Sequence, residues 1–411
     1  MERSNKKQAL KILRITASMD PKHGGPVQMI RSTSLLHREM GHHTDIVSID
    51  PPGSDYLENQ AFHPIPLGPG KYGWAYSSKL KPWLEGHLRQ YDAVILHGLW
   101  LYPSAAAVGV LDTVRKNQTQ TPLCFVFPHG MLDPWFQSWT RRPIKTLRNT
   151  LYWHLLERKT IGMADAVLYT SQTEMRLGQT TFTRYRSKKD VTIPYGCTNP
   201  PEEHDTMRTE FQQKCPTIAH TPYWLYLSRI HPKKGVDLLI KSYMKLLRNP
   251  SSKKKSIPHL VIAGPGMETE YGHLIATLAA PASEYIHFPG MLEGNAKWGA
   301  FYGSCGFFLP SHQENFGISV AEALGCGKRV YISDQVNIHD EISSCDAGVV
   351  AKDDETGTDL LLETALIDLN NEPKEYREKA RTCFEQHFDI AKTAEKLIDL
   401  IHFYHPSPHA R

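Results

Sequence analysis

The sequence predicts an α/β protein built from two doubly wound domains. Three observations support this prediction. The 411 residues suit two domains of ~200 residues each, short apolar runs alternate with helical stretches twice along the chain, and a polar segment separates the two series. Because parallel strands need crossover connections, the alternation favours parallel sheets with helices on both faces. Hydrophobic residues make up 40% and charged residues 22% of the chain, which excludes wholesale disorder.

The first series contains several continuous apolar runs, as expected for strands whose two faces are both covered. Helices are expected over 27–40, which ends before Gly41, and over 144–164, which begins after Pro143. Strands are expected at 9–16, 43–49, 92–97, 122–127, 166–170 and 191–194.

The second series follows a polar stretch from Gly196 to Tyr223, which we interpret as the interdomain linker. Strands are expected at 224–228, 259–263, 286–289, 306–310 and 329–332, and helices at 359–369, 374–387 and 391–403. We therefore expect an N-terminal domain over 1–198 and a C-terminal domain over 199–385. Residues 386–411 should form a helix that packs back on the N-terminal domain.

Several protein classes are disfavoured. The sequence has neither an apolar run of about 18 residues nor the P-loop pattern of Walker-type ATPases. The segment Gly68-Pro-Gly70-Lys-Tyr-Gly73 fits a dinucleotide-binding pattern, but two prolines precede it where a central strand would need amide donors. Lys11 and Arg14 interrupt the apolar start of the chain, so we expect a first strand instead of a signal peptide, and a cytoplasmic protein.

The net charge of +4 produces no strong global field, but basic residues cluster in three places. These clusters are Arg141-Arg142 with Lys145, residues 184–189, and Lys253-Lys254-Lys255. They are either solvated loops or points of peripheral contact with anionic lipid at the inner face of the membrane, and both interpretations stay open. The interleaved aromatic residues of RNA-binding surfaces are lacking, so nucleic acid is not an expected partner.

The most informative segment runs from Gly306 to Gly327. A buried strand should end near Pro310, a polar loop carries Glu314, and a helix should begin after Gly317. Amides around 315–319 would then lie at a helix N-terminus, which suits an anionic ligand. Glu322 follows Glu314 by eight residues, so both carboxylates could border one pocket and accept hydrogen bonds from a hydroxyl-rich ligand.

This segment resembles the Glu-x7-Glu motif of the family 4 retaining glycosyltransferases, which have the GT-B fold of two Rossmann-like domains facing a central cleft. Arg229 to Gly235 resembles the Arg-x4-Lys-Gly turn of that family. Together the matches cover roughly residues 9 to 350 in the family's order. The other matching segments are His23-Gly24-Gly25-Pro26, Pro128-His129-Gly130, Ile193-Pro194-Tyr195-Gly196, Val261-Ile262-Ala263-Gly264-Pro265-Gly266 and Phe288-Pro289-Gly290.

The resemblance implies a role for each matching residue. Charged contacts would hold the donor diphosphate, the glycines would let the backbone approach it, Glu322 would hold the ribose, and Glu314 the transferred sugar. His129 would lie near the reacting carbon. The expected catalytic residues are His129, Glu314, Arg229 and Lys234. The expected donor-binding residues are Gly24, Gly25, Arg229, Lys234, Gly264, Gly290, Asn315, Phe316, Gly317, Ile318 and Glu322.

The implied activity is transfer of a hexosyl group, with retention, from a nucleotide-diphosphate sugar to a hydroxyl of a glycan or polyprenyl-linked saccharide in polysaccharide or glycoconjugate biosynthesis. We expect UDP- or GDP-linked donors ahead of ADP-linked ones. No cofactor and no metal are expected, since the chain lacks Asp-x-Asp and the family uses Arg, Lys and a helix end instead. The alternatives are a sugar-nucleotide epimerase, a phosphorylase, and a catalytically silent nucleotide-sugar-binding protein.

Three residues have no assigned role from the sequence. In Pro194-Tyr195-Gly196-Cys197 the family more often has Asn before the glycine and an Asp soon after it, which leaves Tyr195 and Cys197 unexplained. His97 follows an expected strand, as His129 does, and is either an acceptor-side residue or a structural one.

Overall fold

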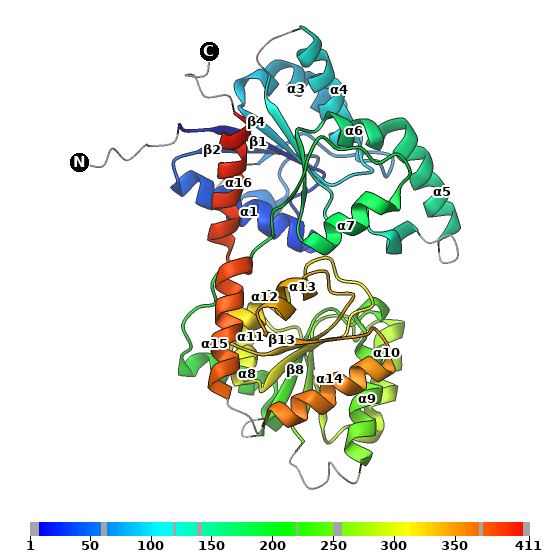
Figure 1. The fold of residues 1–411 in the computed structure, drawn as a ribbon, viewed down its shortest axis with the longest axis vertical. Helices are drawn as coiled ribbons and strands as arrows, with labels where there is room; N and C mark the ends of the chain where they lie inside the picture. Colours follow the sequence, from blue (N-terminus) through cyan, green and yellow to red (C-terminus); the bar gives the residue numbers. More distant parts are fainter. Residues whose placement is uncertain are drawn as a thin grey trace, which may run out of the picture. The chain divides into compact units, whose positions relative to one another are not determined.

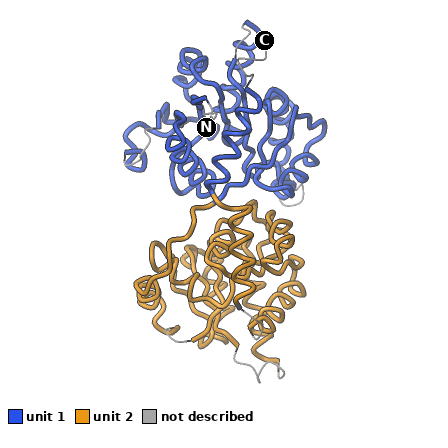
Figure 2. The backbone as a smooth tube through the Cα atoms, turned by 60° about the vertical axis from the view of Figure 1, so that its left-hand side comes forward, with its two compact units in different colours: residues 1–196, 390–411 blue, residues 197–389 orange. Residues whose placement is uncertain are grey.

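The computed structural model describes residues 8–58, 64–117, 121–137, 142–218, 221–249, 257–369 and 373–405. The chain divides into two compact units (Figure 2). Unit 1 comprises Met1–Gly196 and Ile390–Arg411, and unit 2 comprises Cys197–Asp389. The domain boundaries expected after residues 198 and 385 lie close to these. The basic cluster Lys253–Lys255 falls outside the described residues.

The described part of unit 1 contains a parallel seven-stranded sheet in the order β3-β2-β1-β4-β5-β6-β7. Because the strand order reverses between β1 and β4, their carboxyl ends flank the place where doubly wound sheets bind ligands. Every residue of β4 is buried, as its apolar run predicts. The strands are β1 (Lys11–Thr16), β2 (His43–Ser48), β3 (Ile65–Pro66), β4 (Ala93–His97), β5 (Leu123–Phe127), β6 (Ala166–Tyr169) and β7 (Asp190–Thr192).

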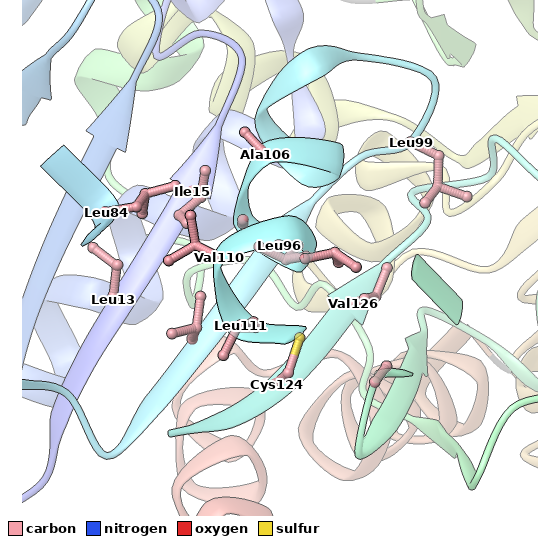
Figure 3. Packing of buried hydrophobic residues seen from close by; sticks show 14 of the residues in the cluster. Leu13, Ile15, Leu84, Leu96, Leu99, Ala106, Val110, Leu111, Cys124 and Val126 are labelled. Atoms are coloured by element: carbon pink, nitrogen blue, oxygen red, sulfur yellow. The ribbon is translucent and has the colours of Figure 1, made fainter. Parts of the chain in front are cut away.

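The helices of unit 1 cover this sheet, and apolar residues of β1, β4 and β5 pack against those of α4 to form its core (Figure 3). The C-terminal helix α16 lies beside α1 (Figure 1). The helix expected over 144–164 is present as α5, a π-helical turn η4 and α6. The helical elements are η1 (Pro21–His23), α1 (Gly25–Glu39), α2 (Asp55–Glu58), α3 (Leu80–His87), η2 (Leu88–Gln90), α4 (Tyr102–Asn117), η3 (Pro134–Gln137), α5 (Pro143–Tyr152), η4 (Trp153–Glu157), α6 (Arg158–Met163), α7 (Gln172–Thr181) and α16 (Ile390–Tyr404).

The described part of unit 2 contains a parallel six-stranded sheet in the order β10-β9-β8-β11-β12-β13, which reverses between β8 and β11. Its strands are β8 (Tyr223–Leu227), β9 (His259–Ala263), β10 (Ile286–Gly290), β11 (Gly306–Leu309), β12 (Val330–Ser333) and β13 (Gly348–Ala351). Its helical elements are α8 (Asp205–Lys214), η5 (Pro216–Ile218), η6 (Pro232–Lys234), α9 (Val236–Arg248), α10 (Glu270–Ala279), η8 (Ala280–Ala282), α11 (Gly294–Gly303), α12 (Ile318–Gly325), α13 (His339–Ser344), α14 (Glu355–Asp368), α15 (Pro373–Cys383) and η9 (Phe384–Phe388).

The expectation of a linker over 196–223 is wrong. Helix α8 lies within that stretch and belongs to unit 2, where it buries Met207 and Phe211. It packs so closely against α11 that a Cβ at Gly299 would lie 2.0 Å from the carbonyl oxygen of Met207. These two large apolar residues, one turn apart in an otherwise polar segment, give too weak a periodicity for the helix to be predicted.

Strands β3 and β13 were not predicted, because β3 has only two residues and β13, GVVA, is an edge strand with three half-buried residues. The interpretation of Gly68–Gly73 is confirmed. The segment follows edge strand β3 and leads into a turn closed by the Lys71–Tyr76 bridge, not into a helix. Within the described residues, no helix is both long and apolar enough to cross a membrane.

Candidate functional site

In unit 2, the expected site residues lie on two loops at the point where the strand order reverses. Arg229 and Lys234 follow β8, and Glu314 follows β11. The loops touch at Gly235, which has a φ of 67° and where a Cβ would lie 1.9 Å from the carbonyl oxygen of Pro310. Only glycine fits this contact. The fold of unit 2 therefore brings Arg229, Lys234 and Glu314 to one place at the carboxyl edge of its sheet.

Lys234 and Glu314 form a largely buried ion pair between these loops. Lys234 Nζ donates to Glu314 Oε2, and the Lys234 side chain is only 9% exposed. Burial opposes ionisation of Glu314, but Lys234, Lys233 and the Asn315 amide outweigh it, so the pKa of the carboxyl lies below its usual value. Arg229 is instead exposed, and can therefore turn toward a ligand.

Neighbouring loops of unit 2 hold this arrangement in place. The amide of Glu314 donates to the carbonyl of Gln335 at 2.9 Å, and the amide of Asn337 donates to the carbonyl of Glu314 at 2.9 Å. Phe316 is buried, with its ring edge-on against Phe388 at 5.7 Å between centroids, so its side chain supports the loop. The main chain of this loop is thereby fixed from both sides.

Helix α12 begins directly after that loop. Its N-cap is Gly317, which has a φ of 78°, and within the described residues no side chain caps the helix by a hydrogen bond. Ile318, its first residue, and Asn315 before it are half-buried. The amide groups and dipole of this helix end can therefore receive an anionic group.

Glu322 lies in the second turn of α12 and has its own cation. Lys297 Nζ on α11 donates to Glu322 Oε1 at 2.9 Å, and the same ammonium lies 4.0 Å from the ring centroid of Trp298. Glu322 is 7% exposed. Lys297 was not predicted as a site residue from the sequence, because α11 carries no motif and lies outside the Glu-x7-Glu segment.

Two of the expected glycines lie beside the Arg229 turn. A Cβ at Gly264 would lie 1.9 Å from the carbonyl oxygen of Ser228, so the end of β9 packs directly on the residue before Arg229. Gly264 also donates its amide to the carbonyl of Gly290, at the end of β10, at 2.8 Å. Both glycines therefore line the same carboxyl edge of the sheet.

In unit 1, the glycine loop and His129 occupy equivalent strand ends. Gly24 is the N-cap of α1, Gly25 is its first residue, and a Cβ at Gly24 would meet no atom within 4 Å. His129 follows β5 with a φ of 55°, a conformation that residues other than glycine rarely adopt. The backbone thus holds the imidazole of His129 in an unusual position beyond the strand.

His129 is the middle member of a hydrogen-bonded chain. The hydroxyl of Tyr195 lies 2.6 Å from His129 Nδ1, and His129 Nε2 lies 3.0 Å from His97 Nδ1. The imidazoles of His97 and His129 are stacked at 5.2 Å between centroids. The structure thus connects Tyr195, which the sequence left without a role, to the predicted catalytic histidine.

Both histidines are held in the neutral form. Burial lowers the pKa of His129 to about 3, and the Arg14 guanidinium adds to the shift. Burial also lowers the pKa of His97 well below its usual value, with His129 and Arg14 contributing. Arg14 is itself fully buried, which lowers its pKa to about 9. At neutral pH each imidazole therefore offers one donor and one acceptor nitrogen.

The histidines open onto a cavity of about 570 Å³ that lies wholly within unit 1. Its lining comes from the carboxyl ends of β1, β2, β4 and β5 and includes Asp50, His97, His129 and the Gly70–Gly73 turn. His97 Nε2 is buried without a hydrogen-bond partner among the described residues. The lining contains one carboxylate and, within the described residues, no Lys or Arg. Such a cavity suits an uncharged ligand with hydroxyl groups.

The oxygens of the Asp50 carboxylate are largely occupied by hydrogen bonds from the protein itself. It accepts hydrogen bonds from the Ser18 hydroxyl at 2.5 Å, the Met19 amide at 2.7 Å and the Tyr56 hydroxyl at 2.9 Å. Among the described residues of the lining, His97 is therefore the one with a buried side-chain polar atom that lacks a hydrogen-bond partner. Within the described part of the chain, no group of three or more His, Cys, Asp or Glu side chains is arranged to hold a metal ion.

Comparisons with known proteins agree with the division into two units. A family model described as glycosyl transferase 4-like domain matches residues 24–196, and one described as glycosyl transferases group 1 matches residues 207–383. D-inositol 3-phosphate glycosyltransferase of Frankia alni is 32% identical over 111 residues, which are 26% of this chain. The match spans 27% of that relative, so this chain covers about a quarter of its length.

Solved structures resemble the whole chain. A glycosyltransferase from Rickettsia africae has a TM-score of 0.74 at 15% identity and covers 97% of this chain and 99% of its own. Anabaena HepE in complex with UDP and glucose has a TM-score of 0.72 at 15% identity and covers 96% and 100%. At this identity the likeness concerns the fold, and it confirms the predicted α/β architecture of two Rossmann-like units.

Proposed function

This chain belongs to the family 4 glycosyltransferases, which have the GT-B fold, and on that premise we propose that it transfers a hexosyl group from a nucleotide-diphosphate sugar to a hydroxyl group with retention of configuration. One observation carries the proposal: the contact between the loops after β8 and β11 places Arg229, Lys234 and Glu314 together where the strand order of unit 2 reverses. Two cations and one carboxylate there match a diphosphate joined to a sugar.

In this proposal the donor lies along the carboxyl edge of the unit 2 sheet. Arg229, Lys234 and the N-terminus of α12 bind the diphosphate, Glu314 accepts hydrogen bonds from the transferred sugar, and Glu322, oriented by Lys297, accepts them from the ribose. The solved structures of Anabaena HepE contain UDP, UDP-glucose, or UDP with glucose, which supports a nucleotide-sugar donor for this fold. We propose UDP- or GDP-linked hexoses ahead of ADP-linked ones.

The chemistry follows from charge stabilisation. As the bond between the anomeric carbon and the phosphate oxygen breaks, positive charge develops on the sugar and negative charge on the diphosphate. Arg229, Lys234 and the helix end stabilise the departing diphosphate without a metal ion. The acceptor hydroxyl attacks from the same face and gives its proton to the departing phosphate oxygen, so configuration is retained.

The acceptor is proposed to bind in the cavity of unit 1. His97 and His129 offer neutral imidazole nitrogens there, and His129 is positioned by the Tyr195 hydroxyl. Because the lining has no Lys or Arg among the described residues, a saccharide hydroxyl fits better than a phosphate group. Glycans and polyprenyl-linked saccharides both present such a hydroxyl.

A product assay tests this proposal. The purified protein is incubated with UDP-, GDP- and ADP-hexoses, with and without saccharide acceptors, and both nucleoside diphosphate release and the anomeric configuration of the product are measured. We expect acceptor-dependent release and a product with the configuration of the donor. An inverted product would contradict retention. Conversion of the donor to another sugar nucleotide without acceptor would instead identify an epimerase.

A further inference from the structure

Helix α5 buries polar side chains and exposes apolar ones, which is the opposite of what is usual for a helix that packs on a soluble domain. Thr146 and Asn149 are each only 2% exposed, although both are polar. The aliphatic side chains of α5 and the following turn lie on the opposite face and are strongly exposed: Ile144 (85%), Leu147 (61%), Leu151 (56%) and Leu155 (67%). Surface helices of soluble proteins normally show the reverse arrangement.

These four aliphatic residues form a single stripe, which we call the α5 stripe. Their spacings of three, four and four residues place them on one side of a helix over about three turns. Figure 1 shows α5 at the edge of unit 1. The stripe is therefore a continuous exposed apolar surface, in contrast to the scattered exposed leucines Leu274 and Leu360 of α10 and α14.

The helix is held in this orientation from its buried side. The Asn149 side-chain amide donates to Gln137 Oε1 at 3.4 Å, and the indole of Trp153, which is fully buried, donates to the Thr183 carbonyl at 3.0 Å. Glu157 accepts a hydrogen bond from the amide of Trp100 at 2.7 Å. Turning the stripe inward would break these contacts, so its exposure is a fixed property of unit 1.

Basic side chains flank the stripe. Arg142, Lys145 and Arg148 are exposed, and no ion pair within the described ranges joins any of them to a carboxylate. On the preceding helix α4 the pattern differs, since Lys116 pairs with Asp112 at 3.2 Å. Burial and the neighbouring guanidinium groups of Arg142 and Arg148 lower the pKa of Lys145, as expected for three like charges held close together.

We propose that α5 docks unit 1 onto an anionic bilayer, with the α5 stripe in the interfacial region and Arg142, Lys145 and Arg148 against lipid headgroups. Arg142 lies over the ring of Trp135, Lys145 over the ring of Phe136, and Arg148 donates to Asn149 Oδ1, but none of the three charges is neutralised by a carboxylate within the described ranges. Exposed aliphatic residues beside such cations match the requirements of interfacial helices, whose binding combines apolar burial with attraction to anionic lipid. A second copy of this chain fits less well, because self-association through the apolar stripe would leave the three cations beside it without a role, whereas attraction to anionic lipid uses them. The proposal is independent of the donor and acceptor proposed above.

The test compares three double variants of the full chain with the wild type in vesicle co-sedimentation. Leu147→Gln/Leu151→Gln removes half of the stripe, and Lys145→Gln/Arg148→Gln removes two of the three charges. Leu274→Gln/Leu360→Gln is the matched control, because it replaces two equally exposed leucines elsewhere. The vesicles contain phosphatidylcholine alone or with about 30% phosphatidylglycerol. Circular dichroism and thermal unfolding establish that each variant is folded.

We expect the wild type and the control to bind the anionic vesicles and to be released as salt rises past ~0.15 M. Each α5 variant should bind at least about tenfold more weakly. Absence of wild-type binding, or equal binding by the wild type and the leucine variant, would overturn the proposal. So would a dimer in sedimentation velocity that only the leucine variant dissociates, because the stripe would then be a self-association surface.

Discussion

Replacing Lys234 with alanine should harm both the stability and the activity of unit 2. Lys234 is 7% exposed, and its partner Glu314 keeps a side-chain exposure of 20%. Removing the ammonium leaves a mostly buried carboxylate without its cation, which typically costs 3–5 kcal/mol. Because Glu314 retains some contact with solvent, we expect about 3 kcal/mol. For a unit of this size, that corresponds to a fall of roughly 6–12 °C in the Tm of unit 2.

The loss of stability in Lys234→Ala should depend on pH in a defined direction. In the wild type the pKa of Glu314 is lowered in the folded state, so the ion pair contributes its full stabilisation of unit 2 at pH values above the ordinary carboxyl pKa of ~4.3. That stabilisation is lost as the pH falls through the lowered pKa of the folded state. In the variant the opposing effect of burial prevails and raises that pKa. The folded variant therefore binds a proton at Glu314 more readily than the unfolded chain does. The difference in the free energy of unfolding between the wild type and Lys234→Ala should therefore shrink as pH is lowered from 7 toward 4.

Arg229→Ala is the matched variant, because it removes a donor contact without removing a buried partner. Arg229 is exposed, so its loss should change the Tm by less than about 2 °C. Turnover should fall ~10- to 1000-fold in both variants, since each loses a charged contact worth ~1.5–3 kcal/mol and part of the leaving-group stabilisation.

The assays are scanning calorimetry at pH 7 and pH 4.5 and nucleoside diphosphate release at saturating donor. The unit 2 transition is assigned in the wild type by its upward shift with bound nucleotide. An unchanged Tm in Lys234→Ala would refute the structural role of the ion pair. Unchanged turnover in both folded variants would refute the placement of the diphosphate.

Four further predictions concern the site. Glu322→Gln should raise the KM for donor and weaken nucleoside diphosphate binding with kcat nearly intact, whereas Glu314→Gln should chiefly lower kcat; the reverse pattern in steady-state kinetics would exchange their partners. EDTA should leave most activity in place, and loss restored by Mg²⁺ or Mn²⁺ would contradict the proposed charge stabilisation. Tyr195→Phe should lower kcat by ~10-fold without changing nucleoside diphosphate affinity, because it loses only the hydrogen bond that orients His129; a change confined to Tm would make Tyr195 merely structural. Since burial lowers the pKa of both His129 and His97, unit 1 should lose stability as pH falls below 6.5, by roughly 1.4 kcal/mol per pH unit for each histidine that stays neutral in the folded state, and for His129 this continues down to about pH 3. A unit 1 Tm that calorimetry finds constant from pH 7 to 5 would contradict this.

The sequence predicted those parts of the fold that depend on strong local patterns. Runs such as AVIL and YWLYL are buried on both faces and became central strands. Helix α8 was missed because its burial depends on two residues that contact α11, about 90 residues later. Helix α5 was predicted as a helix, but which face it buries follows from contacts with Gln137, which bonds to Asn149, and with Thr183, which bonds to Trp153 of η4, and not from its own pattern.

The residues of the candidate site also differ in whether they could be predicted from the sequence. Glu314 and Lys234 could be singled out because they lie in segments that resemble motifs of the family 4 glycosyltransferases. Lys297 lies outside such motifs, and Tyr195 lies within one but at a position where the family more often has Asn. Both reach their partners, Glu322 and His129, through tertiary structure alone. The sequence pattern of a single chain does not indicate that a cation on one helix will pair with a carboxylate on another.

Titration calorimetry of UDP, GDP and ADP into the wild type and into Arg229→Ala tests the central claim most directly. The claim is that the loops after β8 and β11 bind the diphosphate of a nucleotide sugar. We predict that at least one of these nucleotides binds the wild type and that its affinity falls by about tenfold or more in Arg229→Ala. Equal affinity in the two proteins, or no binding of any nucleoside diphosphate to the wild type, would contradict it.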